Sequence, residues 1–425
     1  MIERVEYLNK LISWRERQTI KVVTGVRRCG KSTLFSLYKQ YLESTGVRDE
    51  QIISINLEDI EFEHLLEYRA LYYYIKERLC LDKYTYVFID EVQQCSNFEK
   101  AVDSLFIKEN VDVYITGSNA YMLSGELATM LSGRYVEIQM LPLSFPEYLA
   151  FIKRQSRNEP LYMAEEIMPY KNDLIVGEKL SGVRADFNDY LRYGSFPYIA
   201  SLNKDQTIIK DYISGIYNTI LIKDVAAREG INDISLLENI IKFLSGSIGS
   251  PISTKKISDT INSSGRKISV NTVERYLRAL TDSFIFYKVD RFDIKGKQNL
   301  KTLGKYYIVD TGIRALVTST SSSDLGHLLE NIVFLELLRR GYRVNIGKIA
   351  EKEVDFVATD GSGITYYQVS ATVLDENTLN RELAPLQKIS DNHPKILLTL
   401  DDIMANANYD GIKQINIIDW LLRKA

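Results

Sequence analysis

Residues 25–33 read Gly-Val-Arg-Arg-Cys-Gly-Lys-Ser-Thr, a complete Gly-x-x-x-x-Gly-Lys-[Ser/Thr] motif. An apolar stretch over Thr19–Thr24 precedes it and an amphipathic stretch over Ser32–Tyr41 follows it, which predicts the order strand, loop, helix. In that order the glycines let backbone N–H groups surround phosphate oxygens, and the helix dipole favours the same anion. We expect nucleotide contacts from Gly25, Arg28, Cys29, Gly30, Lys31, Ser32 and Thr33. Within this set, Lys31 would neutralise the β and γ oxygens and the Ser32 hydroxyl would ligate Mg²⁺.

A second apolar stretch, Tyr86–Ile89, ends in the two carboxylates Asp90 and Glu91, about 60 residues after the loop. Such a strand end is often only a solvated turn, but its position after a phosphate loop favours a role in hydrolysis. We expect Asp90 to hold the Mg²⁺ through water. Glu91, beyond the strand tip, is expected to polarise the attacking water as general base.

Further candidates for the same site follow the strand Val111–Thr116. Ligands of open α/β sheets sit at the carboxyl ends of the strands, so Asn119 or Ser118 is a candidate for sensing the γ-phosphate; a simple turn is the alternative. Arg134 is a candidate for stabilising transition-state charge, within one subunit or across a subunit interface, unless it is an ordinary surface arginine. No Asn/Thr-Lys-x-Asp motif of GTPases follows, which favours ATP over GTP.

The chain of 425 residues is long enough for several domains. Its first part, with further strands expected at Ile52–Leu57 and Tyr135–Met140, alternates strands and helices, which predicts an α/β fold with a parallel sheet. Helical spacing over Ile208–Ile222 and Leu236–Leu244 follows. The later elements are expected at Thr254–Ile261 and Ser269–Thr281 (helices), Phe284–Asp290 and Lys305–Val309 (a ribbon), Leu325–Arg340 (a helix), and Val354–Ala358 and Thr365–Val369 (strands).

These patterns predict a P-loop ATPase domain over 1–146, a helical domain over 147–246, a winged helix over 247–318 and a small α/β domain over 319–425. The serine run Ser319–Ser323 marks the last boundary.

The segment Pro251–Tyr306 is basic in a chain whose net charge is −3. It holds five acids against twelve basic residues: Lys255, Lys256, Arg266, Lys267, Arg275, Arg278, Lys288, Arg291, Lys295, Lys297, Lys301 and Lys305. Its own charge is therefore +7 and that of the remainder is −10. A winged helix with this charge would place Arg275 and Arg278 in a DNA groove and Lys295 and Lys297 on phosphates. A protein-docking module or a solvated charged face is the alternative.

These stretches together resemble the prokaryotic AAA-family ATPases that carry an extra carboxy-terminal domain. The resemblance covers nearly the whole chain and includes Gly25–Ser32, Asp90–Gln93, Gly117–Asn119, Ser132–Arg134, Pro142–Tyr148, Tyr193–Pro197 and Lys305–Arg314. It implies an ATPase module, a winged helix and a terminal module similar to restriction-endonuclease folds.

The terminal module departs from the residue pattern of such nucleases. They use carboxylates to hold Mg²⁺ and a lysine to assist the attacking water. Glu330 and Asp355 fit this pattern, but Gln368 is a neutral amide and Ser370 stands where the lysine belongs. We therefore expect a nuclease fold retained for docking DNA or protein.

Composition excludes several other classes of protein. No uncharged apolar run is long enough to span a bilayer, and the start of the chain has no apolar signal core, so a cytoplasmic location is expected. The cysteines Cys29, Cys80 and Cys95 have no metal-ligand spacing. The sequence as a whole predicts an ATP- and Mg²⁺-dependent ATPase acting on DNA and able to form a homo-oligomer. The alternatives are an ATP-gated Mg²⁺-dependent nuclease and a slow nucleotide-sensing scaffold for a protein partner.

Overall fold

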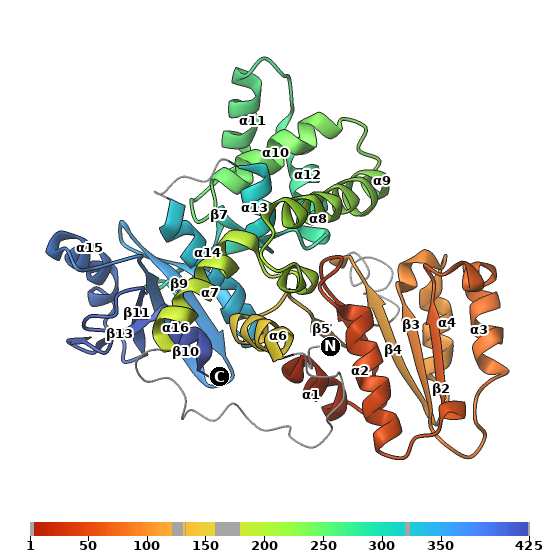
Figure 1. Ribbon diagram of the computed structural model, residues 1–425. Helices are drawn as coiled ribbons and strands as arrows, with labels where there is room; N and C mark the ends of the chain where they lie inside the picture. The colour runs from red at the N-terminus through yellow and green to blue at the C-terminus, as the bar shows by residue number, and fades with distance from the viewer. Residues whose placement is uncertain (1–3, 121–130, 132, 158–178, 319–323, 424–425) are drawn as a thin grey trace. The chain divides into compact units, whose positions relative to one another are not determined.

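The computed structural model describes residues 4–120, 131, 133–157, 179–318 and 324–423 (Figure 1). The expected boundary at Ser319–Ser323 and the middle of the expected helical segment lie outside the described residues. The chain divides into two compact units, one of residues up to 142 with 282–284, and one of the remaining residues. No helix among the described residues is long and apolar enough to cross a membrane.

The first unit is a parallel five-stranded sheet in the order β2-β3-β4-β1-β5 with helices on both faces. Its strands are β1 (Ile20–Thr24), β2 (Ile52–Asn56), β3 (Thr85–Asp90), β4 (Val111–Gly117) and β5 (Tyr135–Gln139). Its helices are α1 (Val5–Ser13), α2 (Lys31–Ser44), α3 (Tyr68–Lys76) and α4 (Phe98–Phe106), with short 3-10 turns η1 (Asp49–Gln51), η2 (Ile60–Leu65) and η3 (Val92–Gln94). The predicted α/β fold with the parallel sheet of a P-loop NTPase is confirmed.

The burial of the residues in each strand agrees with the position of that strand in the sheet. Every residue of β3 is buried, as expected for an inner strand covered on both faces, whereas exposed residues alternate along the edge strand β2. The helices α3 and α4 share one apolar core with residues such as Val87 and Ile89. On the opposite face, Phe35 and Tyr38 of α2 pack against Phe88.

The second unit combines helices with a mixed sheet of eight strands in the order β12-β13-β11-β10-β9-β8-β6-β7. Its first helices are α6 (Phe145–Arg157), α7 (Lys179–Tyr193), η5 (Pro197–Ser201), α8 (Gln206–Thr219), the π-helical turn η6 (Ile220–Ala226), α9 (Ala227–Glu229), α10 (Ile234–Gly246), α11 (Thr254–Ser263) and α12 (Val270–Asp282). The helices α13 (Thr311–Val317), α14 (Leu325–Arg339), α15 (Glu376–Gln387) and α16 (Ile417–Leu422) follow. The strands are β6 (Phe286–Asp293), β7 (Gln298–Ile308), β8 (Arg343–Ile349), β9 (Lys352–Asp360), β10 (Gly363–Val369), β11 (Lys395–Thr399), β12 (Asn408–Tyr409) and β13 (Ile412–Asn416).

The hairpin β6–β7, expected as the free ribbon of a winged helix, is part of this sheet. Residues Arg291–Asp293 of β6 pair in parallel with Ile346–Lys348 of β8. The sheet therefore continues across the boundary expected at residue 318. One edge of β6 pairs with β7, and the other edge is free to form backbone hydrogen bonds with β8. The hairpin is therefore joined to the carboxy-terminal strands.

Two stretches that carried the family resemblance pack against each other within the second unit. The carboxylate of Asp310 accepts hydrogen bonds from the Ser195 backbone N–H (2.6 Å) and hydroxyl (2.9 Å), and it also caps α13 through the Gly312 N–H (2.9 Å). Asp310 is fully buried, and burial raises the pKa of its carboxyl. Gly194, at φ 87°, leaves room for this carboxylate. In this chain the two stretches thus have a structural role, since Asp310 joins them through buried hydrogen bonds.

We expect Gly194→Ala to destabilise the second unit. A Cβ at this position would lie 2.2 Å from Asp310 Oδ1, and alanine also strains a left-handed backbone. The free energy of unfolding, measured in urea, should fall by about 2 kcal/mol or more. Gly182→Ala on α7 is the matched control, because no atom lies within 4 Å of its added Cβ. Equal stability of the two variants would contradict the packing described for Asp310.

Candidate functional site

The predicted phosphate loop connects β1 to α2 at the carboxyl edge of the sheet. Gly30, at φ 107°, caps α2, so the helix begins at Lys31 and its first backbone N–H groups have no partner within the helix. Ser32 is exposed and Thr33 is half-buried in this first turn. The Lys31 amine is buried and donates to the Gly25 carbonyl at 3.0 Å, inside the curve of the loop. This arrangement fits an anion, because N–H donors and one ammonium converge at a helix N-terminus.

The start of the loop requires glycine for two reasons: the backbone conformation is one that other residues rarely adopt, and there is no room for a Cβ atom. Gly25 has φ 145°, and a Cβ there would lie 2.2 Å from the carbonyl oxygen of Met140 after β5. The loop residue Cys29 is completely buried, which raises the pKa of its thiol. The Cys29 side chain therefore packs beneath the loop, and only its backbone remains a candidate for contacting a nucleotide. Arg28, at φ 68°, is exposed.

The two predicted carboxylates lie beside the phosphate loop at the end of β3. Glu91 Oε1 is 3.8 Å from Lys31 Nζ, and Asp90 and Glu91 are both less than 10% exposed. The Thr116 hydroxyl of the neighbouring strand β4 donates to Asp90 and accepts from the Glu91 backbone N–H at 2.9 Å. Glu91 itself is left-handed (φ 53°), which turns the chain sharply after the strand. Thr116 thus orients the Asp90 carboxylate and fixes the backbone of Glu91, a role that the sequence pattern did not indicate.

A second polar group holds Glu91 from the other side. Gln93 donates its side-chain amide to Glu91 Oε2 at 2.5 Å and lies 3.5 Å from the Ser118 hydroxyl. Ser118 and Asn119 are buried directly after β4, at the same sheet edge as the phosphate loop. The predicted sensor residues therefore lie at the site's edge, and Ser118 is within reach of the group that positions Glu91.

Arg4 is a further residue of this site that sequence reasoning missed. Its guanidinium is 3% exposed and donates to the carbonyls of Cys29 (3.0 Å) and Leu141 (2.6 Å). It also lies over the ring of Tyr7, 4.9 Å from the ring centroid. Arg4 therefore ties the middle of the phosphate loop to the chain that follows β5. Nothing local signals this, because the arginine stands far from both partners in sequence.

Arg134 lies at the opposite edge of the sheet from the phosphate loop. Its carbonyl accepts from the N–H of Ile20, the first residue of β1, whereas the loop follows the last residue of that strand. Its guanidinium pairs with Asp103 on α4. A role within the same subunit would require the side chain to cross the length of β1, about 15 Å, which an arginine cannot span. Two of the proposed roles of Arg134 are compatible with this position: acting on the site of a neighbouring subunit, or being an ordinary surface arginine.

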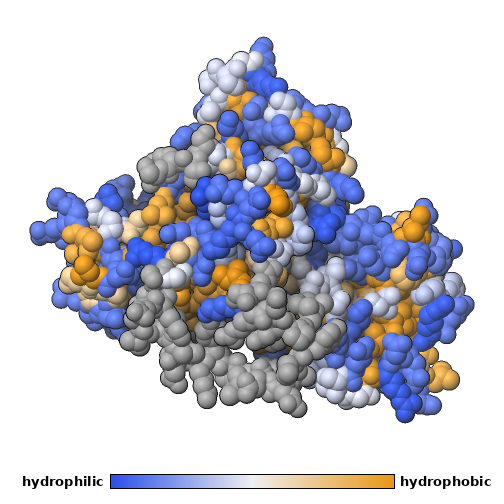
Figure 2. All heavy atoms as spheres, viewed as in Figure 1, coloured by the Kyte–Doolittle hydropathy of each residue, from blue (hydrophilic) through white to orange (hydrophobic). Residues whose placement is uncertain are grey.

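Most of the predicted basic segment is exposed, with one clear exception. The exposed cations of α11, the α11–α12 turn, α12 and the hairpin tip form the basic surface: Lys255, Lys256, Lys267, Arg275, Arg278, Lys295 and Lys297. In Figure 2 the surface over α11 is blue and white. Arg266 is also exposed, but lies 3.6 Å from Asp233. Lys305 is 2% exposed and was wrongly counted as a surface charge.

The candidate nuclease residues are only partly brought together. Glu330 of α14 and Asp355 of β9 both face Lys305. Gln368, however, accepts from the Asp355 N–H (3.3 Å) and donates to Glu382 (2.9 Å), and Ser370 donates to the Thr372 carbonyl. Burial and the nearby Glu330 raise the pKa of Asp355 well above its usual range. Among the described residues, no group of three or more His, Cys, Asp or Glu side chains could hold a metal ion.

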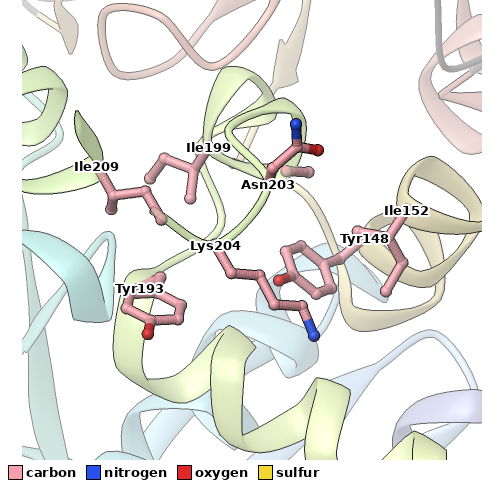
Figure 3. A pocket seen from close by; sticks show the side chains of 8 residues that line it. Tyr148, Ile152, Tyr193, Ile199, Asn203, Lys204 and Ile209 are labelled. Atoms are coloured by element: carbon pink, nitrogen blue, oxygen red, sulfur yellow. The ribbon is translucent and has the colours of Figure 1, made fainter. Parts of the chain in front are cut away.

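A separate pocket of about 230 Å³ opens in the second unit between α6, η5 and the start of α8 (Figure 3). Its walls are mostly apolar and aromatic: Tyr148, Ile152, Tyr193, Ile199, Ala200, Asn203, Lys204 and Ile209. The Lys204 amine at its mouth is paired with Asp186 and Asp189. No predicted site residue lines this pocket.

Comparisons with known proteins agree with the P-loop ATPase fold of the first unit. Residues 17–149 match the model of an AAA domain, and residues 184–324 match a domain of unknown function. A solved structure, the Walker-type ATPase PABY2304 of Pyrococcus abyssi, is similar in fold, with a TM-score of 0.50 and 16% identity. That similarity covers 75% of this chain and 96% of the other.

Two relatives match nearly the full length of the chain. An uncharacterized protein of Methanocaldococcus jannaschii is 29% identical over 94% of this chain and 85% of its own. An uncharacterized protein of Haemophilus influenzae is 38% identical over 100% of this chain and 99% of its own. This chain therefore belongs to the same family as the Haemophilus influenzae protein, with an AAA-type P-loop ATPase domain over residues 17–149.

Proposed function

We propose that this protein hydrolyses ATP with Mg²⁺ and couples its nucleotide state to DNA bound at the basic surface. The observation that carries the ATPase is the convergence of Lys31 and Glu91 to 3.8 Å at the carboxyl edge of the sheet. A phosphate-binding ammonium and a candidate general base meet there, and both are buried, where charges act strongly on a reacting group.

The residues of the loop fit a nucleoside triphosphate with its metal. Lys31 and the first N–H groups of α2 would bind phosphate, and Ser32 and Asp90 would hold Mg²⁺, which neutralises the charge that develops on the phosphate oxygens. Glu91 would accept the proton of the attacking water, and the amide of Gln93 would keep the Glu91 carboxylate in place. Thr116 orients Asp90 in the same way.

Arg134 would complete the site of a neighbouring copy. It lies on the sheet edge far from its own loop, with 43% of its side chain exposed, so it is available to a second subunit. An arginine supplied across an interface stabilises transition-state charge. This role requires a homo-oligomer.

The DNA contact is proposed for α12 and the hairpin tip. Arg275 and Arg278 are exposed and stand three residues apart on one face of α12. The preceding turn is rigid, because the Ser258 hydroxyl donates to the Ile268 carbonyl (3.0 Å) and the Ile268 N–H donates to Asn262 (2.7 Å). ATP turnover measured alone and with double-stranded, single-stranded and forked DNA tests the coupling. Turnover that no DNA alters would favour the nucleotide-sensing scaffold.

Reversing Arg275 and Arg278 to Glu should weaken DNA binding without changing basal ATP turnover. Each phosphate contact contributes about 0.9 to the slope of log affinity against log salt concentration, so losing two should lower the slope by about 2. Binding is measured by fluorescence anisotropy at several salt concentrations. The double variant Arg48→Glu, Lys76→Glu is the control, because both cations are exposed on the other unit. Equal slopes for the two double variants would point to a protein-docking module.

A further inference from the structure

Three carboxylates meet a single buried lysine in the second unit. This carboxylate cluster consists of Glu330 on α14 and Glu353 and Asp355 on β9. Lys305 Nζ lies 2.9 Å from Glu330 Oε1, 2.7 Å from Glu353 Oε1 and 3.9 Å from Asp355 Oδ1. The lysine side chain is 2% exposed. The ammonium is thus within hydrogen-bond distance of two carboxylates and within ion-pair distance of the third.

The surrounding hydrogen bonds fix the cluster around this ammonium. Tyr307 donates to Glu330 at 2.6 Å, and the Val369 backbone N–H donates to Asp355 Oδ2 at 2.8 Å. Glu330 Oε1 thus accepts from both Tyr307 and Lys305, and Asp355 is held through Oδ2 while its Oδ1 lies 3.9 Å from the lysine. Carboxylate oxygens are the ligands that hard divalent cations prefer.

The lysine comes from the hairpin, outside the strands that carry the carboxylates. Lys305 belongs to β7, and β7 pairs only with β6 in the sheet. Gln368 of β10 accepts from the Asp355 backbone N–H and donates to Glu382, and Ser370, directly after β10, donates to the Thr372 carbonyl. The cation beside the carboxylates is therefore supplied by β7, whereas β10 contributes the Val369 N–H to Asp355 and no cation.

We propose that the ammonium of Lys305 is the resident cation of the carboxylate cluster and occupies the place of a divalent metal. The chain supplies its own counter-charge, so the carboxy-terminal module needs no metal and has no metal-dependent nuclease activity. The same contact fastens the β6–β7 hairpin to α14 and β9. This inference does not depend on the proposed ATPase.

With Lys305 in place, no group of three carboxylates among the described residues is arranged to hold a metal ion. Removing the ammonium should leave the three carboxylates without a counter-charge and let them close around a divalent cation. Without nucleotide, which would bring metal to the phosphate loop, the unfolding temperature of the full chain is measured with and without MnCl₂. Lys305→Ala should unfold at a lower temperature than the wild type and regain about 5 °C at a Mn²⁺ concentration 100 times the dissociation constant. The wild type and the control Lys288→Ala, an exposed cation of β6 in the same hairpin, should shift by less than about 1 °C.

Further variants decide the outcome. Adding Asp355→Asn to Lys305→Ala should abolish the Mn²⁺ effect, because it removes one ligand. A folded Lys305→Ala protein that Mn²⁺ does not stabilise would overturn the proposal. If Lys305→Ala does not fold, Mn²⁺ binding to the wild type is followed by electron paramagnetic resonance. The wild type is expected to bind no Mn²⁺ ion that the Asp355→Asn variant fails to bind. If the wild type binds one ion that Asp355→Asn loses, a metal and not Lys305 is the resident cation.

Discussion

Lys31→Ala is expected to weaken ATP binding by at least about 100-fold, or roughly 2.7 kcal/mol. The Lys31 ammonium is buried at the loop and is the charge expected to meet the β and γ oxygens. Its loss also removes the ion-pair partner that lies 3.8 Å from Glu91. The unpaired Glu91 carboxylate would then repel the incoming phosphate. Binding is measured by titration with a fluorescent ATP analogue in the presence of Mg²⁺.

Lys39→Ala is the matched control for this change. Lys39 belongs to the same helix, α2, but its amine donates to the Ser54 hydroxyl at 2.9 Å, away from the loop. Its affinity for ATP should stay within about twofold of the wild type, well under the tenfold that 1.4 kcal/mol represents. Unimpaired ATP binding by Lys31→Ala, with the fold intact by circular dichroism, would remove the loop from the proposed mechanism.

Glu91→Gln is expected to keep ATP binding and to lose turnover by about 10²- to 10⁴-fold. The amide has nearly the shape of the carboxylate and can still accept a hydrogen bond from Gln93, but it cannot take a proton from water. ATP should therefore accumulate on the variant, which retention of radiolabelled ATP after rapid desalting detects. Single-turnover hydrolysis by the same sample gives the rate of the chemical step.

The control for Glu91→Gln is Glu50→Gln, a change of an exposed carboxylate whose nearest ion-pair partner is Arg48 at 3.5 Å. Its turnover should equal that of the wild type. Hydrolysis at the normal rate by Glu91→Gln would mean that another group activates the water. Asp90 would then be the next carboxylate to change, since it lies on the same strand end.

The sequence predicted the sheet of the first unit and the main residues of its site. Strands β1 to β5 lie within one or two residues of the expected ranges, because short apolar runs between turn residues report local burial. The loop Gly25–Ser32 and the pair Asp90 and Glu91 carry their chemistry in consecutive residues. Their meeting at one sheet edge follows from parallel strands alone.

Sequence reasoning was weakest where charge had to be located in space. Lys305 was counted with a basic surface, but it neutralises carboxylates in the interior. The sequence left open a role for Arg134 in its own subunit. In the structure Arg134 directly precedes β5, and it is the other end of β5 that lies close to the phosphate loop. Composition over a segment gives the sum of charges and contains no information on which of them water reaches.

The sequence by itself determined that this chain has a P-loop ATPase fold and where its phosphate loop lies, since motif, strand and helix are contiguous. Only the tertiary structure decided that Arg4 braces the loop, that Thr116 holds the Asp90 carboxylate and the Glu91 backbone, and that the hairpin joins the carboxy-terminal sheet. The physical reason is that these contacts join residues far apart in the chain. Local periodicity predicts an element's type and its buried face, whereas the partner of each buried polar group is set by how the elements pack.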